Sequence, residues 1–140
     1  MNAARLLSMA VVTGLTLVSP ALAAGDAAKG EKDFKKCKAC HAIVADDGTA
    51  IVKGGKTGPN LYGVIGRQVA STDFNYGDSI KAVGETGLVW DEAELAAYIT
   101  DPKAWLVEKT GDAGVKSKMS FKLNKGQEDI AAYLASVSAQ

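Results

Sequence analysis

Side chains that bind metals through nitrogen or sulfur are scarce in this chain of 140 residues, which has two cysteines and one histidine. A zinc site normally needs four protein ligands, or three and a water, and no further cysteine or histidine exists to complete one. A single histidine also excludes a metal centre held by two histidines. An excess of charge is lacking too, since 16 basic residues balance 16 acidic ones, so net charge says little about partners.

Long apolar runs are also absent beyond the N-terminus, where residues 1–23 have the pattern of a secretory signal peptide. Arg5 gives a positive start, residues 6–18 are apolar and uncharged, and small residues stand at the expected cleavage position. The apolar run is short for a membrane span. We therefore expect cleavage after residue 23 or after Ala24, export from the cytoplasm, and one domain over residues 24–140.

The two cysteines and the histidine fall within five consecutive positions, Cys37-Lys38-Ala39-Cys40-His41. Cys-x-x-Cys-His is the attachment signature of a c-type haem. Two thiols two residues apart on a helical turn can each add to one vinyl group along the porphyrin edge. The next residue then lies under the ring, where its imidazole can reach the iron. This motif predicts a haem bound covalently to Cys37 and Cys40, with His41 as the proximal axial ligand.

A haem-free dithiol oxidoreductase is the alternative interpretation of the cysteine pair. A thioredoxin-like dithiol should lie between a strand and a helix, and no strand-like run precedes Cys37. A structural disulfide inside so short a loop is also disfavoured. Covalently bound haem colour in the denatured protein would eliminate the oxidoreductase.

Hydrophobic spacing and capping residues predict helices separated by long loops. The expected helices cover residues 26–39, 76–84, 91–100, 102–108 and 127–137, and the expected loops cover residues 42–75 and 110–123. Within the first loop, the β-branched pairs at 43–44 and 51–52 could make local bridges.

Three local features refine these helices. Asp26 is the expected N-cap of the first helix, and Asp91 is expected to begin a capping box with Glu94. Gly30 inside a helix costs about 1 kcal/mol relative to alanine. A close crossing with the last helix, under Ile130 or Tyr133, would explain its presence.

Met119 is the only methionine that remains when the signal peptide is removed, since Met1 and Met9 lie within it. It belongs to a loop, residues 116–121, and not to the apolar face of a helix. A methionine that fills a gap in the core is the ordinary role. Its uniqueness and its loop setting favour an axial ligand instead, and a soft thioether prefers reduced iron and raises the reduction potential.

These motifs together resemble the class I c-type cytochromes, and most closely the bacterial cytochrome c2 type of small periplasmic electron carriers. The resemblance covers residues 25–140 and rests on residues 37–41, Trp90, Gly58-Pro59-Asn60-Leu61 and Lys118-Met119-Ser120-Phe121. It implies an all-α cytochrome c fold. In that fold about five helices wrap around one covalently attached haem c, and the N- and C-terminal helices pack together.

The resemblance assigns four residues to haem attachment and iron ligation and a fifth to the support of the histidine. Cys37 and Cys40 resemble the thioether pair, and His41 and Met119 resemble the two axial ligands. Pro59 resembles the residue whose backbone carbonyl accepts a hydrogen bond from the axial imidazole. Such a contact would set the tautomer and the orientation of the ring.

Five more residues match the wider haem environment. Arg67, Tyr76 and Trp90 match positions near the buried propionates, where donors compensate a desolvated charge. Tyr98 and Ser117 resemble the polar neighbours of the methionine sulfur. The alternatives are that Arg67 is a solvated loop arginine and that Trp90 and Tyr98 are ordinary core residues.

The predicted function is a periplasmic, single-haem electron carrier that acts as a monomer, binds no nucleic acid and does not insert into the membrane. It is not expected to be an enzyme, because two axial ligands leave no open position for a substrate. The family resemblance implies a cytochrome bc1 complex as donor and a photosynthetic reaction centre, a terminal oxidase or both as acceptor. The alternative function is a haem peroxidase-like enzyme with a labile methionine ligand.

Charge is unevenly distributed along the chain. Residues 73–101 contain seven acids and one lysine, whereas residues 103–125 contain six lysines and two acids. This asymmetry predicts a dipolar protein whose basic face steers acidic partners. The candidate lysines are Lys35, Lys38, Lys53, Lys56, Lys103, Lys116, Lys118, Lys122 and Lys125.

Overall fold

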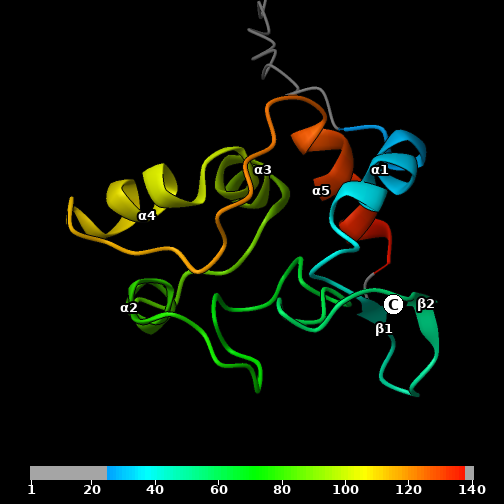
Figure 1. Cartoon of the computed structure of the whole chain (residues 1–140), viewed down its shortest axis with the longest axis horizontal. Helices are drawn as coiled ribbons and strands as arrows, with labels where there is room; N and C mark the ends of the chain where they lie inside the picture. The colour runs from blue at the N-terminus through cyan, green and yellow to red at the C-terminus, as the bar shows by residue number, and fades with distance from the viewer. Residues whose placement is uncertain (1–24, 138–140) are drawn as a thin grey trace, which may run out of the picture.

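The computed structural model describes residues 25–137, so the predicted signal peptide and its cleavage site lie outside the described residues. The described part of the chain contains five α-helices, one 3₁₀ turn and a small antiparallel pair of strands (Figure 1). In chain order the elements are α1 (Ala27–Asp33), η1 (Phe34–Lys36), β1 (Ile43–Val44), β2 (Ala50–Val52), α2 (Asp78–Glu85), α3 (Glu92–Thr100), α4 (Pro102–Thr110) and α5 (Gln127–Ser136). Over residues 25–137, no helix combines the length and the apolar character that crossing a bilayer requires.

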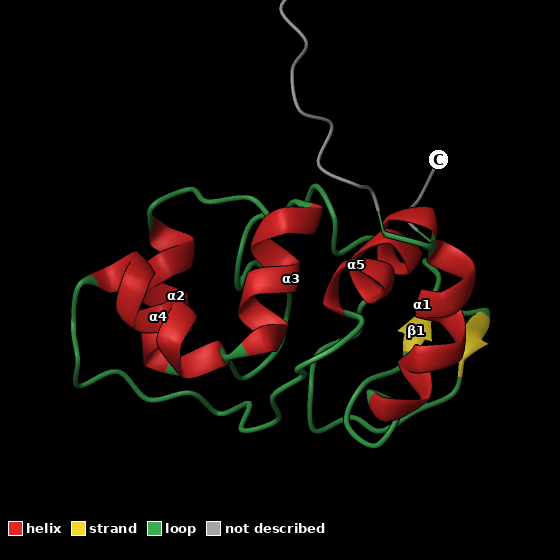
Figure 2. Ribbon diagram, turned by 90° about the horizontal axis from the view of Figure 1, so that it is seen from above, coloured by secondary structure: helices red, strands yellow, loops and turns green. Residues whose placement is uncertain are grey.

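The first and last helices, α1 and α5, lie side by side, as Figures 1 and 2 both show. The predicted crossing at Gly30 is confirmed, because a Cβ built there would lie 2.8 Å from the Cβ of Tyr133. The closest atom is the backbone oxygen of Asp129, at 1.9 Å, and the sequence did not predict this backbone contact. Asp26 is the N-cap of α1 as expected, and its amide donates a hydrogen bond to Asp129 Oδ1 at 2.7 Å.

The prediction of one helix over residues 26–39 is wrong at its C-terminal half. The α-helix ends at Asp33, and η1 and a turn continue it. In a 3₁₀ turn, side chains three residues apart lie above one another. The tighter turn therefore brings Phe34 and Cys37 into line, and both face the same cavity.

The helices α3 and α4 follow each other almost directly. Asp91 caps α3, since its carboxylate accepts a hydrogen bond from the Glu94 amide at 2.7 Å. The expected capping box is only half formed, because the Glu94 side chain turns toward α4. Pro102 begins α4 as expected, and the helix extends two residues beyond the predicted end, to Thr110. Gly111, with its positive φ of 71°, is the C-cap.

Two other expectations concern shorter elements. The local bridges are confirmed, since β1 pairs with β2 through Ile43 and Val52. The helix expected at residues 76–84 begins two residues later, with Gly77 as the N-cap of α2. Figure 2 shows α2, α3 and α4 on one side of the molecule and α1, α5 and the strands on the other. The most deeply buried large side chains are Phe34, Ile43, Val69, Leu106, Ile130 and Leu134.

Candidate functional site

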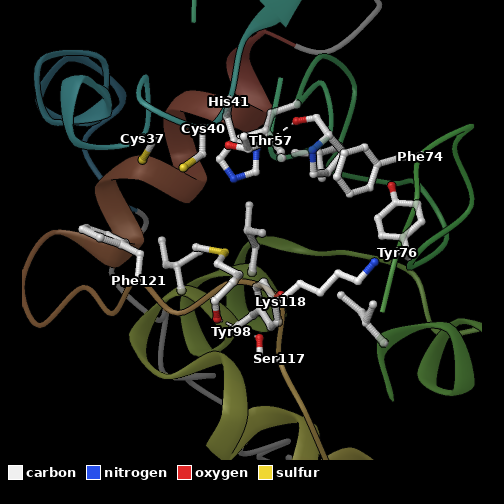
Figure 3. A pocket seen from close by; sticks show the side chains of 18 of the residues that line it. Cys37, Cys40, His41, Thr57, Phe74, Tyr76, Tyr98, Ser117, Lys118 and Phe121 are labelled. Atoms are coloured by element: carbon white, nitrogen blue, oxygen red, sulfur yellow. Dashed lines mark hydrogen bonds between the residues drawn. The ribbon is translucent and has the colours of Figure 1, made fainter. Parts of the chain in front are cut away.

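A cavity of about 320 Å³ lies between these elements, and its walls are mostly apolar side chains. The sequence-predicted site residues all line it: Cys37, Cys40, His41, Pro59, Arg67, Tyr76, Trp90, Tyr98, Ser117 and Met119. Figure 3 shows Cys37, Cys40 and His41 on one side of the space, with Tyr98 and Ser117 on the opposite side. The fold therefore gathers into one place residues that the sequence distributes over most of the domain.

His41 presents a defined nitrogen to this cavity. Its Nδ1 lies 2.8 Å from the backbone oxygen of Pro59, and a carbonyl oxygen only accepts, so Nδ1 carries the proton and donates. The other ring nitrogen, Nε2, then keeps its lone pair. Burial lowers the pKa of His41, and the hydrogen bond to Pro59 only partly opposes this. A neutral imidazole with a free Nε2 is the form that binds a metal.

Gly58 makes this arrangement possible, and its role was missed in the sequence. A Cβ at this position would lie 2.3 Å from Cε1 of His41, so only glycine leaves room for the ring. The next residues hold the loop in place, since the Asn60 side chain accepts a hydrogen bond from the Val44 amide at 2.9 Å and donates one to its carbonyl at 2.7 Å. The sequence did contain a signal for this role, since a glycine stands directly before Pro59-Asn60.

The two cysteines, Cys37 and Cys40, are free thiols. Burial is the main cause that raises the pKa of Cys37 to about 11, so this side chain is a neutral thiol at physiological pH. Thiol–disulfide exchange requires a thiolate, and reactive cysteines have a lowered pKa. The environment of Cys37 therefore disfavours the haem-free dithiol oxidoreductase.

The two residues directly before Met119 anchor the loop that carries it. Ser117 Oγ donates a hydrogen bond to the Met119 backbone oxygen at 2.7 Å, and Lys118 Nζ donates one to Asn75 O at 2.9 Å. Burial raises the pKa of Tyr98, and a side-chain hydrogen bond with Ser117 partly offsets that effect. The polar side chains expected near the methionine thus lie in the same wall of the cavity.

Arg67 and Trp90 are brought together by backbone pairing of their segments. The Trp90 amide donates to Arg67 O at 2.9 Å, and the Gly66 amide donates to Trp90 O at 2.7 Å. The half-buried guanidinium donates to Tyr62 O at 3.1 Å and to Asn60 O at 3.2 Å, and burial lowers its pKa. Arg67 is therefore an ordered part of the cavity wall and not a solvated loop side chain.

The expected basic face is partly neutralised by ion pairs between the acidic and basic segments. Lys122 pairs with Asp101 at 2.6 Å, and Lys109 pairs with Glu94 at 2.7 Å. Lys116 and Lys118 line the cavity, together with Phe121, which is 43% exposed. Lys36 lines it as well, and its ammonium pairs with Asp33 at 3.1 Å. Figure 3 shows Lys118 extending toward Tyr76, on the other side of the view from Phe121.

No cluster of three or more His, Cys, Asp or Glu side chains that could hold a metal ion occurs within residues 25–137. No family model matches the chain. Cytochrome c-550 of Paracoccus versutus is 62% identical over 130 residues, which are 90% of this chain and 84% of that protein. Cytochrome c2 of Rhodobacter capsulatus is 58% identical over 132 residues, which are 94% of this chain and 96% of that protein.

A solved structure agrees with these relatives. The X-ray structure of ferric cytochrome c-550 from Paracoccus versutus matches with a TM-score of 0.80 at 64% identity, over 82% of this chain and 99% of that chain. The chain belongs to the class I c-type cytochromes of the c2 type. It is an electron carrier and not an enzyme, and the comparisons do not support the peroxidase alternative.

The cofactor of this cytochrome is one covalently attached haem c. The residues in the cavity fit that group, because two free thiols and a neutral imidazole with an available nitrogen face one apolar space. The cytochrome c fold predicted from the sequence is likewise confirmed.

Proposed function

We propose that this cytochrome is a periplasmic carrier that takes single electrons from a cytochrome bc1 complex and delivers them to a photosynthetic reaction centre, a terminal oxidase or both. When bound, the haem iron supplies a one-electron ferrous–ferric couple. Export is supported by the signal-peptide pattern of residues 1–23. The partner complexes are inferred from the family resemblance.

We assign haem attachment to Cys37 and Cys40. With haem bound, each thiol would add across one vinyl double bond, so a sulfur–carbon bond would form and the thiol hydrogen would pass to the neighbouring carbon. Nothing leaves, and no external oxidant or reductant is consumed. The neutral state of the Cys37 thiol in this site is compatible with such an addition, and the two cysteines line the cavity beside His41.

We assign iron ligation to His41 Nε2 and to the sulfur of Met119. The observation that carries this assignment is the hydrogen bond from His41 Nδ1 to Pro59 O, which leaves Nε2 as the free donor atom. Fixing the tautomer of a histidine ligand through its second nitrogen is a common feature of metal sites. With these two ligands bound, the iron would have no open position for a substrate.

The remaining residues control the surroundings of the cofactor. Apolar walls exclude water, and the half-buried charge of Arg67 compensates acidic groups that enter the cavity. Around this cavity, Lys36, Lys116 and Lys118 line the same space as Phe121, which is 43% exposed. This combination suits a brief encounter with an acidic partner, because charge speeds association while the small apolar contact permits release.

Replacing the two axial ligands separately tests this proposal. His41→Ala should prevent accumulation of a normal low-spin holoprotein, since the chain has no other histidine. Met119→Ala should keep the covalent haem, because the cysteines are untouched, but its reduction potential should fall with the loss of the thioether. Phe121→Ala is the matched control in the same loop, and it should keep both the spectrum and the ligand.

The measurements are the absorption spectrum of the native and the denatured protein and a redox titration. An unchanged potential in Met119→Ala would contradict the methionine assignment. A normal low-spin spectrum in His41→Ala would contradict the histidine assignment. Absence of covalent haem from the parent protein would overturn the attachment residues.

A further inference from the structure

Three aromatic rings pack against one another behind the cavity. The ring centroids of Trp90 and Trp105 lie 5.0 Å apart with an interplanar angle of 24°, which is a stacked pair. Tyr98 lies 5.2 Å from both tryptophans, in tilted and edge-on arrangements. Trp90 and Tyr98 line the cavity, whereas Trp105 does not and is only 3% exposed. Trp105 therefore supports the wall from its far side.

The Glu94 side chain holds the supporting ring by its edge. Trp105 Nε1 donates a hydrogen bond to Glu94 Oε2 at 2.7 Å, and Lys109 Nζ donates one to Glu94 Oε1 at 2.7 Å. The same ammonium lies 5.7 Å from the centroid of the Trp105 ring. Both carboxylate oxygens are thus engaged, and one residue in the first turn of α3 connects two residues of α4.

Stacking and this hydrogen bond restrain different motions of Trp105. Stacking sets the distance between the Trp90 and Trp105 planes, but it leaves one ring free to turn or slide within its own plane. A hydrogen bond from Nε1 to a fixed carboxylate removes that freedom. The bond also satisfies a buried indole N–H, which would otherwise lose its solvation without compensation.

We propose that Glu94 is a positioning residue for the haem site, acting through Trp105 to hold Trp90 and Tyr98 in the cavity wall. The inference rests on the proposed placement of the haem in this cavity. It assigns the carboxylate a role beyond joining α3 to α4. Without the carboxylate of Glu94, the cavity wall loosens and water reaches the cofactor more easily.

The reduction potential distinguishes this role from an effect of charge. Removing a negative charge near the iron disfavours the ferric state and raises the potential. Admitting water favours the more highly charged ferric state and lowers it. Glu94→Gln and Glu94→Ala remove the same charge, but only glutamine keeps an oxygen that can accept from Trp105. We therefore expect the potential of Glu94→Ala to lie below that of Glu94→Gln.

Repeating both Glu94 substitutions in a protein that also carries Trp105→Phe completes the test, because phenylalanine stacks but has no N–H. In that background, Glu94→Ala and Glu94→Gln should have the same potential. Glu92→Ala is the control for charge alone, since Glu92 is an exposed acid in the same turn of α3. Near-ultraviolet circular dichroism should show the loss of the fixed tryptophan environment in Glu94→Ala and its retention in Glu94→Gln.

Two results would overturn the inference in a folded protein with covalent haem. One is an identical potential for the Ala and Gln variants of Glu94, and the other is a difference that persists in the Trp105→Phe background. If Glu94→Ala does not fold, Trp105→Phe alone decides the question, since a potential equal to the parent's would also refute it. A parent protein without covalent haem in this site would count against the proposed function instead.

Discussion

Gly30 lies where the first helix directly contacts the backbone of the last helix, so Gly30→Ala tests whether that crossing stabilises the fold. A Cβ at this position would lie 1.9 Å from the backbone oxygen of Asp129, whereas ordinary contact begins at 3.4 Å. The helices must therefore separate by about 1.5 Å, the difference between these two distances. The obstacle is backbone, so no side-chain rotation on α5 can relieve it.

The expected loss of stability follows from two opposing effects. Alanine is favoured over glycine inside a helix by about 1 kcal/mol. Overpacking a well-packed contact costs about 1–3 kcal/mol, and a backbone obstacle places Gly30 at the upper end of that range. The free energy of unfolding should therefore fall by about 2 kcal/mol. For a domain slightly above 100 residues this corresponds to a decrease in Tm of about 8 °C.

Thermal unfolding of the holoprotein, followed by far-ultraviolet circular dichroism and by the haem absorption band, measures this loss. Lys32→Ala is the matched control, because Lys32 is exposed on the same helix and should change the free energy of unfolding by less than about 0.5 kcal/mol. Gly30→Val should destabilise the protein more than Gly30→Ala. A Gly30→Ala variant as stable as the parent would refute the packing argument.

Two further predictions concern the site and the docking surface. Gly58→Ala should displace the imidazole of His41, whose Cε1 would lie 2.3 Å from the new Cβ, and the yield of low-spin holoprotein should fall. Gly77→Ala is its control, because Gly77 has a φ of −71° and a Cβ there would lie no closer than 3.4 Å to any atom beyond its chain neighbours, and equal yields for the two variants would argue against the steric role of Gly58. Lys116→Glu should slow oxidation by an acidic partner up to about tenfold at low ionic strength, an effect that salt should abolish. Lys81→Glu, whose lysine pairs with Asp78, should change that stopped-flow rate much less, and equal effects would contradict docking at the cavity rim.

The contrast with Lys122 shows why the structure matters for choosing such variants. Its place near Met119 in the sequence made it a candidate for the docking face. In the structure its ammonium lies 2.6 Å from Asp101, which also accepts a hydrogen bond from the Ala104 amide at the start of α4. A charge reversal at Lys122 would therefore disturb a helix cap as well as the surface charge, and its effect on docking would be ambiguous.

The sequence alone determined the chemistry that depends on neighbouring residues. The motif of residues 37–41 predicts haem attachment, because its three functional side chains are close together along the chain. The uniqueness of Met119 in the predicted domain favours it as the second ligand. Helix caps such as Asp26 and Asp91 were also predictable, since a cap bonds to amides two or three residues away. The family resemblance then supplied the fold.

Only the tertiary structure decided which side chains contact or bond to each other across distant segments of the chain. Glu94 was expected to complete its own capping box, but its carboxylate bonds to Trp105 and Lys109 on the next helix, because a buried indole N–H and an ammonium compete for it. Gly58 is needed only because the ring of His41 folds back over it. Such contacts depend on how distant segments pack, and a linear sequence contains no periodicity that reports the distance between two side chains on different helices.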